Sequence, residues 1–263
     1  MTIPAPGTGS PEQHLSLLRL HLPTVPEALA SLLRTVVVAL FLLTFLLQPY
    51  LIPSESMEHT LLVGDFLLVD KQIFAPGGKE GSLSHWLMPH RDVARGDIVV
   101  FHHPDPPYLV KRVVGIPGDR IRIEDGRVTV NGTPQDEPYA AFEPIDPSPF
   151  PDEFPAKVYS DPQVDIAWWK QMQSLTHNGE LVVPAGEYFV LGDNRNHSKD
   201  SRFWGFVPRQ AIIARPLVIY FSIRRPSTTD VQEAADDRLG HDRELSVRLI
   251  GFARWKRIFH VVH

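Results

Sequence analysis

Apolar residues fall into one long uncharged run near the start of the chain and many short segments after it. Residues 35–54 contain no charged side chain, and residues 36–47 are apolar at all but one position. The 20 residues of the uncharged run are about what a helix needs to cross ~30 Å of hydrocarbon. The pattern therefore predicts one membrane-spanning helix followed by an extramembrane body.

The bounds of this helix follow from its flanking residues. Thr24 followed by Glu27 is a capping-box pattern that predicts a helix start, and Pro49 favours a helix end. We therefore expect a tail over residues 1–24 and a transmembrane anchor helix over residues 25–52. A cleavable signal peptide is the main alternative, but the run begins deep in the chain and no small-residue cleavage site follows it. A buried helix of a soluble protein is a third, weaker alternative.

Charges beside the run predict its orientation only weakly. Residues 1–54 carry two basic and two acidic side chains, so the bias of positive charge toward the inner side is small. Arg34 directly precedes the apolar run and favours an inner N-terminus. This orientation predicts a single-pass protein of the cell membrane, with its body on the extracytoplasmic side.

The body shows the pattern of strands. Short apolar runs bounded by Gly, Asp or Pro are typical of buried strands, and Asp125-Gly126 between two of them predicts a type I′ hairpin turn. The runs lie at residues 66–69, 98–101, 108–114, 120–123, 128–130, 188–191 and 217–221. We therefore expect a mainly β, antiparallel barrel or sandwich over residues 53–225.

Two stretches interrupt the strand pattern, and a tail follows it. Residues 72–93 lack any period and predict a surface loop or small hairpin. Residues 137–178 begin with a proline-rich stretch and are too long for a plain connection, so we expect a cap lobe inserted between two core strands. Residues 226–263 form a C-terminal tail, whose end fits either a basic amphipathic helix on the membrane or a segment docked on the body.

Composition narrows the chemistry of the body. Hydrophobic residues make up 43% of the chain and the formal net charge is -5, which favours a globular core and argues against a nucleic-acid partner. Cysteine is absent, which excludes disulfides, zinc-thiolate sites and a cysteine nucleophile. The motifs of common serine hydrolases, zinc peptidases and nucleotide-binding proteins are also absent, and we expect no metal and no cofactor.

Candidate catalytic groups follow the apolar run directly. Ser54 and Ser56 stand just after it, although serines in that place are usually polar linker. In the predicted strand over residues 108–114, Lys111 and Arg112 point to opposite faces that are both otherwise apolar, so one of them must be drawn inward. A buried lysine loses its proton more readily, and a neutral amine can deprotonate a serine hydroxyl. A lysine that reaches solvent from a strand edge fits this pattern equally well.

A third polar cluster ends another predicted strand. The sequence GDNRNHSKDSR at residues 192–202 supplies carboxylates, guanidinium groups and hydroxyls that could hold a lysine in one rotamer. Its simpler interpretation is a turn stabilised by its own hydrogen bonds.

These segments together resemble bacterial signal peptidase I (leader peptidase), over roughly residues 36–221. Four motifs carry the resemblance: PSESMEHTL at 53–61, RGDIVVF at 95–101, KRVVGIPGD at 111–119 and GDNRNHSKDSR at 192–202. The resemblance implies a membrane-bound serine endopeptidase. Such an enzyme removes N-terminal signal peptides from exported preproteins after small residues (Ala-x-Ala) through an acyl-enzyme.

The resemblance also implies roles for individual residues. Ser56 would be the nucleophile and a neutral Lys111 the general base, with an oxyanion hole made by Ser54 Oγ and the Ser56 backbone N–H. Ser198 would orient the lysine, supported by Asp193, Arg112, Asp200 and Arg202. Pockets for small substrate side chains would be lined by Ile52, Met57, Leu61, Leu67, Val100 and Val110.

The implied partners are preproteins bound as an added strand and the lipid bilayer, with the protein-export machinery as a further candidate. The sequence departs from the family pattern in three places. His59 stands where a proline is usual, Asn196-His197 replaces the usual Asp-Asn, and one span is predicted where many relatives have two.

Two other classes of protein share part of this pattern. A self-cleaving, repressor-type Ser-Lys hydrolase would need a DNA-binding helix-turn-helix, and the first 30 residues are too short and not basic. A non-catalytic, membrane-tethered β domain that binds exported chains would tolerate the loss of Ser56 or Lys111, and both are present.

Overall fold

The computed structural model describes residues 25–41, 46–74, 91–105, 107–142, 153–155, 161–224 and 252–263. The chain divides into two compact units, Met1–Thr44 and Phe45–His263, which are considered separately. The expected tail over residues 1–24 lies outside the described residues.

The described part of the first unit is helix α1, Val25–Phe41. Glu27 lies in its first turn, where a negative side chain interacts favourably with the positive end of the helix dipole and stabilises the helix. None of its residues is buried, and its valine, leucine and phenylalanine side chains are between 44% and 83% exposed. In the described ranges no helix is both long enough and apolar enough to cross a membrane.

The prediction of one anchor helix over residues 25–52 is wrong for the C-terminal part of that range. Leu47–Leu51 form strand β1, which pairs antiparallel with β2, Asp65–Asp70. Pro49 lies opposite Leu68 in this pairing. Proline lacks the N–H that a helix interior requires but is tolerated in a strand at the edge of a sheet. Pairing with β2 therefore decides the structure here, although the residues are uncharged.

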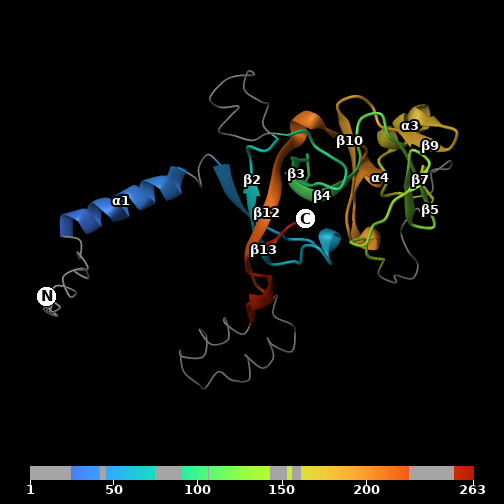
Figure 1. The fold of residues 1–263 in the computed structure, drawn as a ribbon. Coiled ribbons are helices and arrows are strands. Elements are labelled where there is room, and N and C mark those ends of the chain that lie inside the picture. The colour runs from blue at the N-terminus through green and yellow to red at the C-terminus, as the bar shows by residue number, and fades with distance from the viewer. Residues whose placement is uncertain are drawn as a thin grey trace, which may run out of the picture. The chain divides into compact units, whose positions relative to one another are not determined.

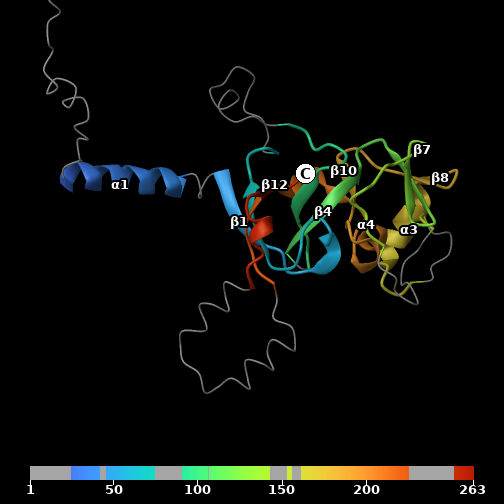
Figure 2. The same ribbon diagram turned by 60° about the horizontal axis from the view of Figure 1, so that its bottom comes forward.

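The second unit is built on antiparallel strands, which confirms the mainly β prediction (Figures 1 and 2). Its larger sheet has eight strands: seven in the order β1-β2-β12-β3-β4-β10-β11, and β13, which pairs with β12 outside this order. Besides β1 and β2, its strands are β3 (Ile98–His102), β4 (Tyr108–Gly115), β10 (Glu187–Leu191), β11 (Val207–Pro208), β12 (Ile212–Ser222) and β13 (His260–Val261). A short helix, α4 (Ser201–Trp204), follows β10.

The larger sheet is curled. Tyr50 of β1 and Tyr108 of β4 meet edge to face with ring centroids 6.5 Å apart, although three strands separate β1 from β4 in the sheet order. Within the described ranges, no strand pairs with the outer edge of β1 or with residues 108–111 on the β10 side of β4. Two unpaired strand edges therefore approach one another where the sheet curls.

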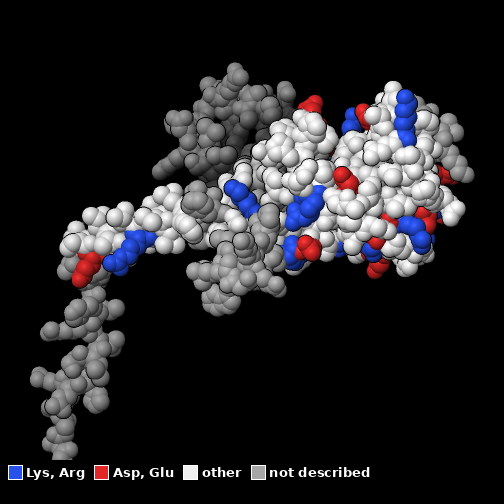
Figure 3. All heavy atoms as spheres, turned by 90° about the horizontal axis from the view of Figure 1, so that it is seen from above, with Lys and Arg blue, Asp and Glu red and all other residues white. Residues whose placement is uncertain are grey.

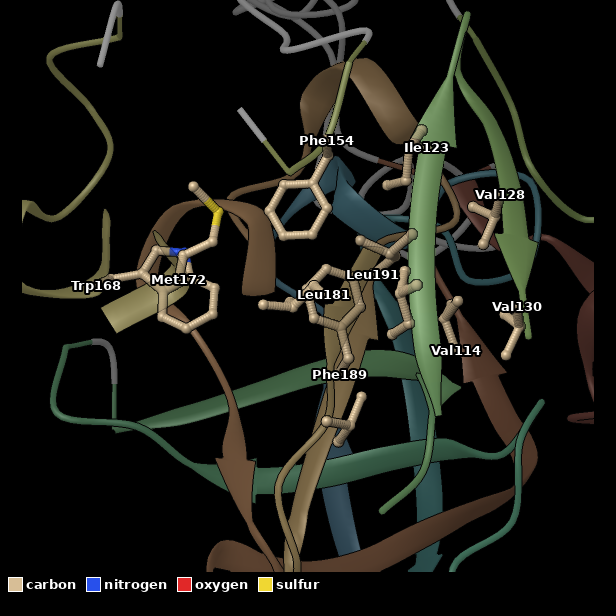
Figure 4. Close-up of a cluster of buried hydrophobic side chains, with 12 residues drawn as sticks. Val114, Ile123, Val128, Val130, Phe154, Trp168, Met172, Leu181, Phe189 and Leu191 are labelled. Carbon is tan, nitrogen blue, oxygen red and sulfur yellow. The ribbon is translucent and has the colours of Figure 1, made fainter. Parts of the chain in front are cut away.

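A smaller sheet of five strands, in the order β7-β6-β5-β9-β8, lies beside the larger one. Its strands are β5 (Arg120–Glu124), β6 (Arg127–Val130), β7 (Thr133–Pro134), β8 (Thr176–His177) and β9 (Glu180–Val182), and helix α3 (Ile166–Leu175) directly precedes β8. Figure 4 shows side chains of the hairpin, of α3 and of β10 pointing into one buried cluster, among them Val128, Met172 and Phe189. This cluster joins the small sheet to β10 of the large one.

Strand β8, in the expected cap lobe over residues 137–178, shares a sheet with strands that precede that range. The predicted hairpin is confirmed, because β5 and β6 are joined by Asp125 (φ 48°) and Gly126 (φ 73°), both in the left-handed region that a type I′ turn requires. The hairpin belongs to the smaller sheet, however, since Ile121 pairs with Leu181 of β9. The described strands between residues 120 and 182 therefore form one small sheet, and apolar side chains of β5, β6 and β9 pack in one cluster with Trp168 and Met172 of α3.

The predictions for the loop and the tail have different outcomes. Most of the expected surface loop over residues 72–93 lies outside the described residues. The described end of the tail, residues 252–263, docks on the body: β13 pairs with β12 and Val262 is only 4% exposed. The docked alternative is confirmed for this segment.

Candidate active site

The turn that follows β1 presents Ser56. After the buried Ile52 the chain forms a single 3-10 turn, η4, over Glu55–Met57. The Leu61 N–H donates to the Met57 carbonyl at 2.7 Å, and both of these side chains are 1% exposed or less. Buried apolar side chains therefore hold the turn in place, and Ser56 itself is only 8% exposed.

Lys111 reaches Ser56 from the facing strand. It lies on β4 opposite Val99 of β3, is 2% exposed, and its Nζ donates a hydrogen bond to Ser56 Oγ at 2.5 Å. Burial lowers the pKa of Lys111 from 10.5 to about 8, against the attraction of the Asp200 and Asp193 carboxylates. With that pKa about a tenth of the amine is neutral at pH 7, compared with well under one part in a thousand for an exposed lysine.

Ser54 lies on the outer side of this pair. Its Oγ is 3.4 Å from Ser56 Oγ, and its side chain is exposed. A group bound at Ser56 would therefore have the Ser54 hydroxyl beside it.

Arg112, the neighbour of Lys111, is held in a buried ion pair. Figure 3 shows charged side chains of both signs scattered over one face of the second unit, but Arg112 and Asp193 are 4% and 0% exposed. The Arg112 Nε and Nη2 donate to the two Asp193 oxygens at 2.8 and 2.7 Å, and Thr60 Oγ1 donates to the same carboxylate at 2.5 Å. The guanidinium also lies 3.8 Å from the Tyr139 ring centroid.

The strand pattern requires one of Lys111 and Arg112 to be drawn inward, and in the structure both are buried. The physical reason is that Asp193 neutralises the guanidinium in bidentate geometry, which offsets the cost of burying it.

The loop over residues 192–202 is held by a second buried pair. Arg202 Nε and Nη2 donate to Asp200 at 2.8 and 2.7 Å, and the Gly192 N–H donates to the same carboxylate at 3.0 Å. Burial raises the pKa of Asp200, but the Arg202 guanidinium outweighs it and the pKa is lowered overall. Asp200 therefore stays charged, and its charge acts on Lys111.

Ser198 lies beside the nucleophile turn without a bond to the lysine. Its Oγ is buried and has no hydrogen-bond partner in the described structure. A Cβ built on Gly192 would lie 2.2 Å from Ser198 Oγ and 2.4 Å from the Ser56 carbonyl oxygen. Gly192 therefore allows Ser198 and the Ser56 backbone to approach each other closely.

The structure brings together all six residues expected to line the substrate pockets. Each is 7% exposed or less, and all belong to one buried cluster beneath the nucleophile turn. They are Ile52, Met57, Leu61, Leu67, Val100 and Val110.

The arrangement is suited to acyl transfer. A buried serine hydroxyl within hydrogen-bond reach of a lysine with a lowered pKa is the geometry of an activated nucleophile. Within the described residues, no group of three or more His, Asp or Glu side chains is placed to hold a metal ion.

Comparison with known proteins identifies the family. The family model described as "Signal peptidase, peptidase S26" matches residues 25–221. The chain belongs to this family. A signal peptidase I of Leptolyngbya laminosa is 36% identical over 208 residues, which cover 76% of this chain and 81% of the relative. A signal peptidase I of Pseudomonas fluorescens is 33% identical over 219 residues, covering 78% and 75%.

A solved structure of a signal peptidase I from Enterococcus faecalis V583 is 28% identical, with a TM-score of 0.32; the match covers 48% of this chain and 97% of the solved chain. Membership of the peptidase S26 family confirms the resemblance found in the sequence and makes the chain a serine peptidase.

One departure from the pattern of signal peptidase I has a structural consequence. His59 has φ 78°, in the left-handed region, whereas proline is confined to φ near −65°. The turn after Ser56 therefore has a backbone conformation that the usual proline could not adopt. The other departure, Asn196-His197, lies in the 3-10 turn η5 over Arg195–His197.

Several supporting residues were missed by the sequence analysis. Arg195 Nη1 and Nη2 donate to Glu137 at 2.8 and 2.7 Å, and Arg195 is 2% exposed. Arg195 and Thr60 stood within the matched motifs and could have been found there. No local signal links Glu137 or Tyr139 to the loop, because the contacts depend on how the lobe folds back.

Proposed function

We propose that this chain removes N-terminal signal peptides from exported preproteins, cleaving after small residues in an Ala-x-Ala pattern. Ser56 is the nucleophile and Lys111 the general base. The observation that carries the proposal is the 2.5 Å separation of Lys111 Nζ and Ser56 Oγ in a site that lowers the pKa of the lysine to about 8. The substrate class rests on the relatives, which are named signal peptidase I.

Acylation begins with the neutral form of Lys111. Its lone pair takes the proton of the Ser56 hydroxyl while Oγ bonds to the carbonyl carbon of the scissile peptide. The tetrahedral intermediate collapses as the C–N bond breaks, and the Lys111 ammonium gives its proton to the leaving amine. The mature protein departs, and the signal peptide stays as an ester on Ser56.

Deacylation repeats the same proton transfers with water. Lys111 takes a proton from a water molecule as its oxygen bonds to the ester carbon. The ammonium then returns the proton to Ser56 Oγ as the ester bond breaks, which restores the enzyme and releases the signal peptide as a carboxylic acid that gives its remaining proton to solvent. The same buried amine therefore serves both steps.

The oxyanion of each tetrahedral intermediate needs hydrogen-bond donors. We assign this role to the Ser54 hydroxyl and the Ser56 backbone N–H. Ser54 Oγ lies 3.4 Å from Ser56 Oγ, so it can face an oxygen on the carbon that Ser56 attacks. Loss of one such donor ordinarily lowers kcat by about 10²–10³.

The supporting residues act through the lysine. The buried pair of Arg112 with Asp193 ties β4 to the loop after β10, and the buried pair of Asp200 with Arg202 holds that loop, whose charges act on Lys111. We assign Ser198 to the same support, because it lies against the Ser56 backbone through Gly192.

Substrate binding follows from the unpaired strand edges near Ser56. Among the described residues, the outer edge of β1 and residues 108–111 on the β10 side of β4 pair with no strand, so their main-chain groups can bind an extended peptide. Ile52, Met57 and Val110 belong to one buried apolar cluster. We propose that their side chains wall shallow pockets that admit only small side chains, which would set the Ala-x-Ala preference.

We also propose that the chain works at the cell membrane, with its body on the extracytoplasmic side. Support comes from the uncharged run over residues 35–54 and from the exposed apolar side chains of α1. The lipid bilayer is then a partner, as is the export machinery that delivers preproteins. Sharing a membrane with the substrate would raise the effective concentration of both.

Two substitutions test the chemistry. Ser56→Ala and Lys111→Ala should each abolish cleavage of a preprotein carrying Ala-x-Ala, while circular dichroism shows a folded body. Ser174→Ala and Lys170→Ala, at exposed positions of α3, are matched controls and should cleave normally. Retained cleavage in either active-site variant would refute the Ser56–Lys111 assignment, whereas a wild-type chain that binds the preprotein without cleaving it would favour a non-catalytic binding domain.

A flotation assay tests the membrane proposal. The full chain should float with phospholipid vesicles, and Val37→Arg combined with Leu40→Arg should abolish flotation because both side chains are exposed on α1. Protease added outside cells stripped of their outer layers should digest the body. Equal flotation of the double variant, or protection of the body, would overturn this part of the proposal.

A further inference from the structure

The C-terminal segment, residues 252–263, is seated on the larger sheet. A 3-10 turn, η7 (Trp255–Arg257), leads into β13, which pairs with Val218 and Ile219 of β12. The backbone N–H groups of Phe259 and Val262 donate to β12 carbonyls at 2.7 and 2.9 Å. The segment is therefore part of the larger sheet. It lies next to β12, which itself carries no catalytic group.

Arg257 ties this segment to the turn that follows the nucleophile. Its Nη2 donates to Asp65 at 2.6 Å and to the Thr60 carbonyl at 2.9 Å. Asp65 is fully buried and also accepts the Leu62 N–H at 2.8 Å and the Ser222 hydroxyl at 2.6 Å. One guanidinium therefore joins both ends of the turn over residues 60–65.

That turn is connected to the reacting groups on both sides. Thr60 lies four positions after Ser56, and its hydroxyl donates to Asp193, the partner of Arg112. The segment also reaches these groups by packing, since Val262 belongs to the buried cluster that contains Met57 and Leu61.

A last contact comes from the main chain. The carbonyl oxygen of His263 accepts a hydrogen bond from Arg112 Nη1 at 3.2 Å. Arg112 directly follows Lys111 on β4, so the segment touches the strand of the base as well as the turn of the nucleophile.

We propose that the C-terminal segment positions the active site through Arg257, the main positioning residue, together with Val262 and His263. The proposal rests on the Ser56–Lys111 mechanism given above. Without the guanidinium, the remaining partners of the buried Asp65 carboxylate among the described residues are the Leu62 N–H, the Ser222 hydroxyl and a more distant Arg254, 3.9 Å away. The turn would then relax toward solvent, which costs catalysis steeply because small misplacements of reacting groups have large effects.

The same relaxation would admit water to Lys111. Burial is the main cause of the lowered pKa of this lysine, so hydration should move the pKa back toward 10.5. A role confined to overall stability would reduce the amount of active enzyme and leave the pH dependence of the remaining activity unchanged.

The test compares Arg257→Gln, Arg257→Lys and Lys256→Ala in the full chain. Lys256 is exposed and adjacent, so its variant removes one positive charge from the same segment without breaking these contacts. Cleavage of an Ala-x-Ala preprotein is measured from pH 6 to pH 10, well below the thermal midpoint of each variant. The values are corrected for the folded fraction.

Arg257→Gln should lower kcat roughly 10–100-fold and leave KM within about twofold of the wild type. In its pH–activity profile, the acidic limb, where cleavage falls as the pH drops, should move to higher pH. Arg257→Lys keeps the positive charge but lacks the paired N–H donors of the guanidinium. Its kcat and its acidic limb should therefore lie between those of Arg257→Gln and the wild type. Lys256→Ala should match the wild type. If Arg257→Gln does not fold, the shift of the limb in Arg257→Lys decides the question.

An unchanged kcat and limb in folded Arg257→Gln or Arg257→Lys would overturn the proposal. Loss of activity that only follows the folded fraction would overturn it as well. This failure is distinct from failure of the proposed function, which would show instead as full cleavage by Ser56→Ala or Lys111→Ala.

Discussion

Replacing Lys111 with methionine should stabilise the protein at neutral pH while abolishing cleavage. The pKa of Lys111 is about 8 in the fold instead of 10.5, which corresponds to about 3 kcal/mol against the charged amine. Methionine fills a similar volume without a charge to bury, but loses the hydrogen bond to Ser56, about 1 kcal/mol. We expect a net gain of about 2 kcal/mol at pH 7, or about 4–8 °C in the thermal midpoint.

The stability gain of the Lys111→Met variant should only decrease as the pH rises. Between pH 8 and 10.5 the unfolded chain binds more protons at this lysine than the folded chain, so the stability of the wild type rises with pH. The methionine variant lacks this rise. Its advantage should therefore be full below about pH 8 and gone near 10.5.

Thermal denaturation at pH 7, 8, 9 and 10, in one detergent and at one scan rate, measures the difference. Lys170→Met is the matched control, because Lys170 is exposed on α3, and it should show no pH-dependent difference. A Lys111→Met variant that is less stable than the wild type at pH 7, or an advantage that does not change with pH, would refute the reasoning.

Three further outcomes follow from the site. The kcat/KM should fall as pH drops below about 8, because Lys111 takes up a proton; an acidic limb near 10.5 would contradict a buried base. Gly192→Ala should lower kcat at least tenfold in a preprotein assay, since the new Cβ would meet Ser198 Oγ and the Ser56 carbonyl, and normal activity would contradict this crowding. In urea unfolding, His59→Gly should gain about 0.5–1 kcal/mol and His59→Pro should lose about 1–3 kcal/mol, because His59 has φ 78°; equal stabilities would argue against this turn.

Much of the local structure could be predicted from the sequence. The hairpin at Asp125-Gly126 was predictable because a type I′ turn needs two residues that accept positive φ. The strand that carries Lys111 was predictable because a short β-branched run bounded by turn residues favours a strand. Such signals act over a few residues and do not depend on the rest of the fold.

The ranges of the larger parts were not predictable in the same way. The uncharged run over residues 35–54 satisfies the pattern of a membrane helix to its end, yet Leu47–Leu51 pair with β2. Likewise the hairpin over residues 120–130 joins the smaller sheet through β9. Strand partners come from distant parts of the chain, and the local pattern of apolar residues is the same whichever partner is chosen.

The amino-acid sequence by itself determined which groups are available: a serine after the uncharged run, a lysine within an apolar strand, and an acidic, arginine-rich loop. Only the tertiary structure decided that Ser56 and Lys111, 55 residues apart, meet at 2.5 Å, and that Arg257 reaches Asp65 across 192 residues. The curling of one sheet brings these residues together and removes water from them. Proximity and dehydration, the two conditions that make the lysine a base, are properties of the folded chain and of no single segment.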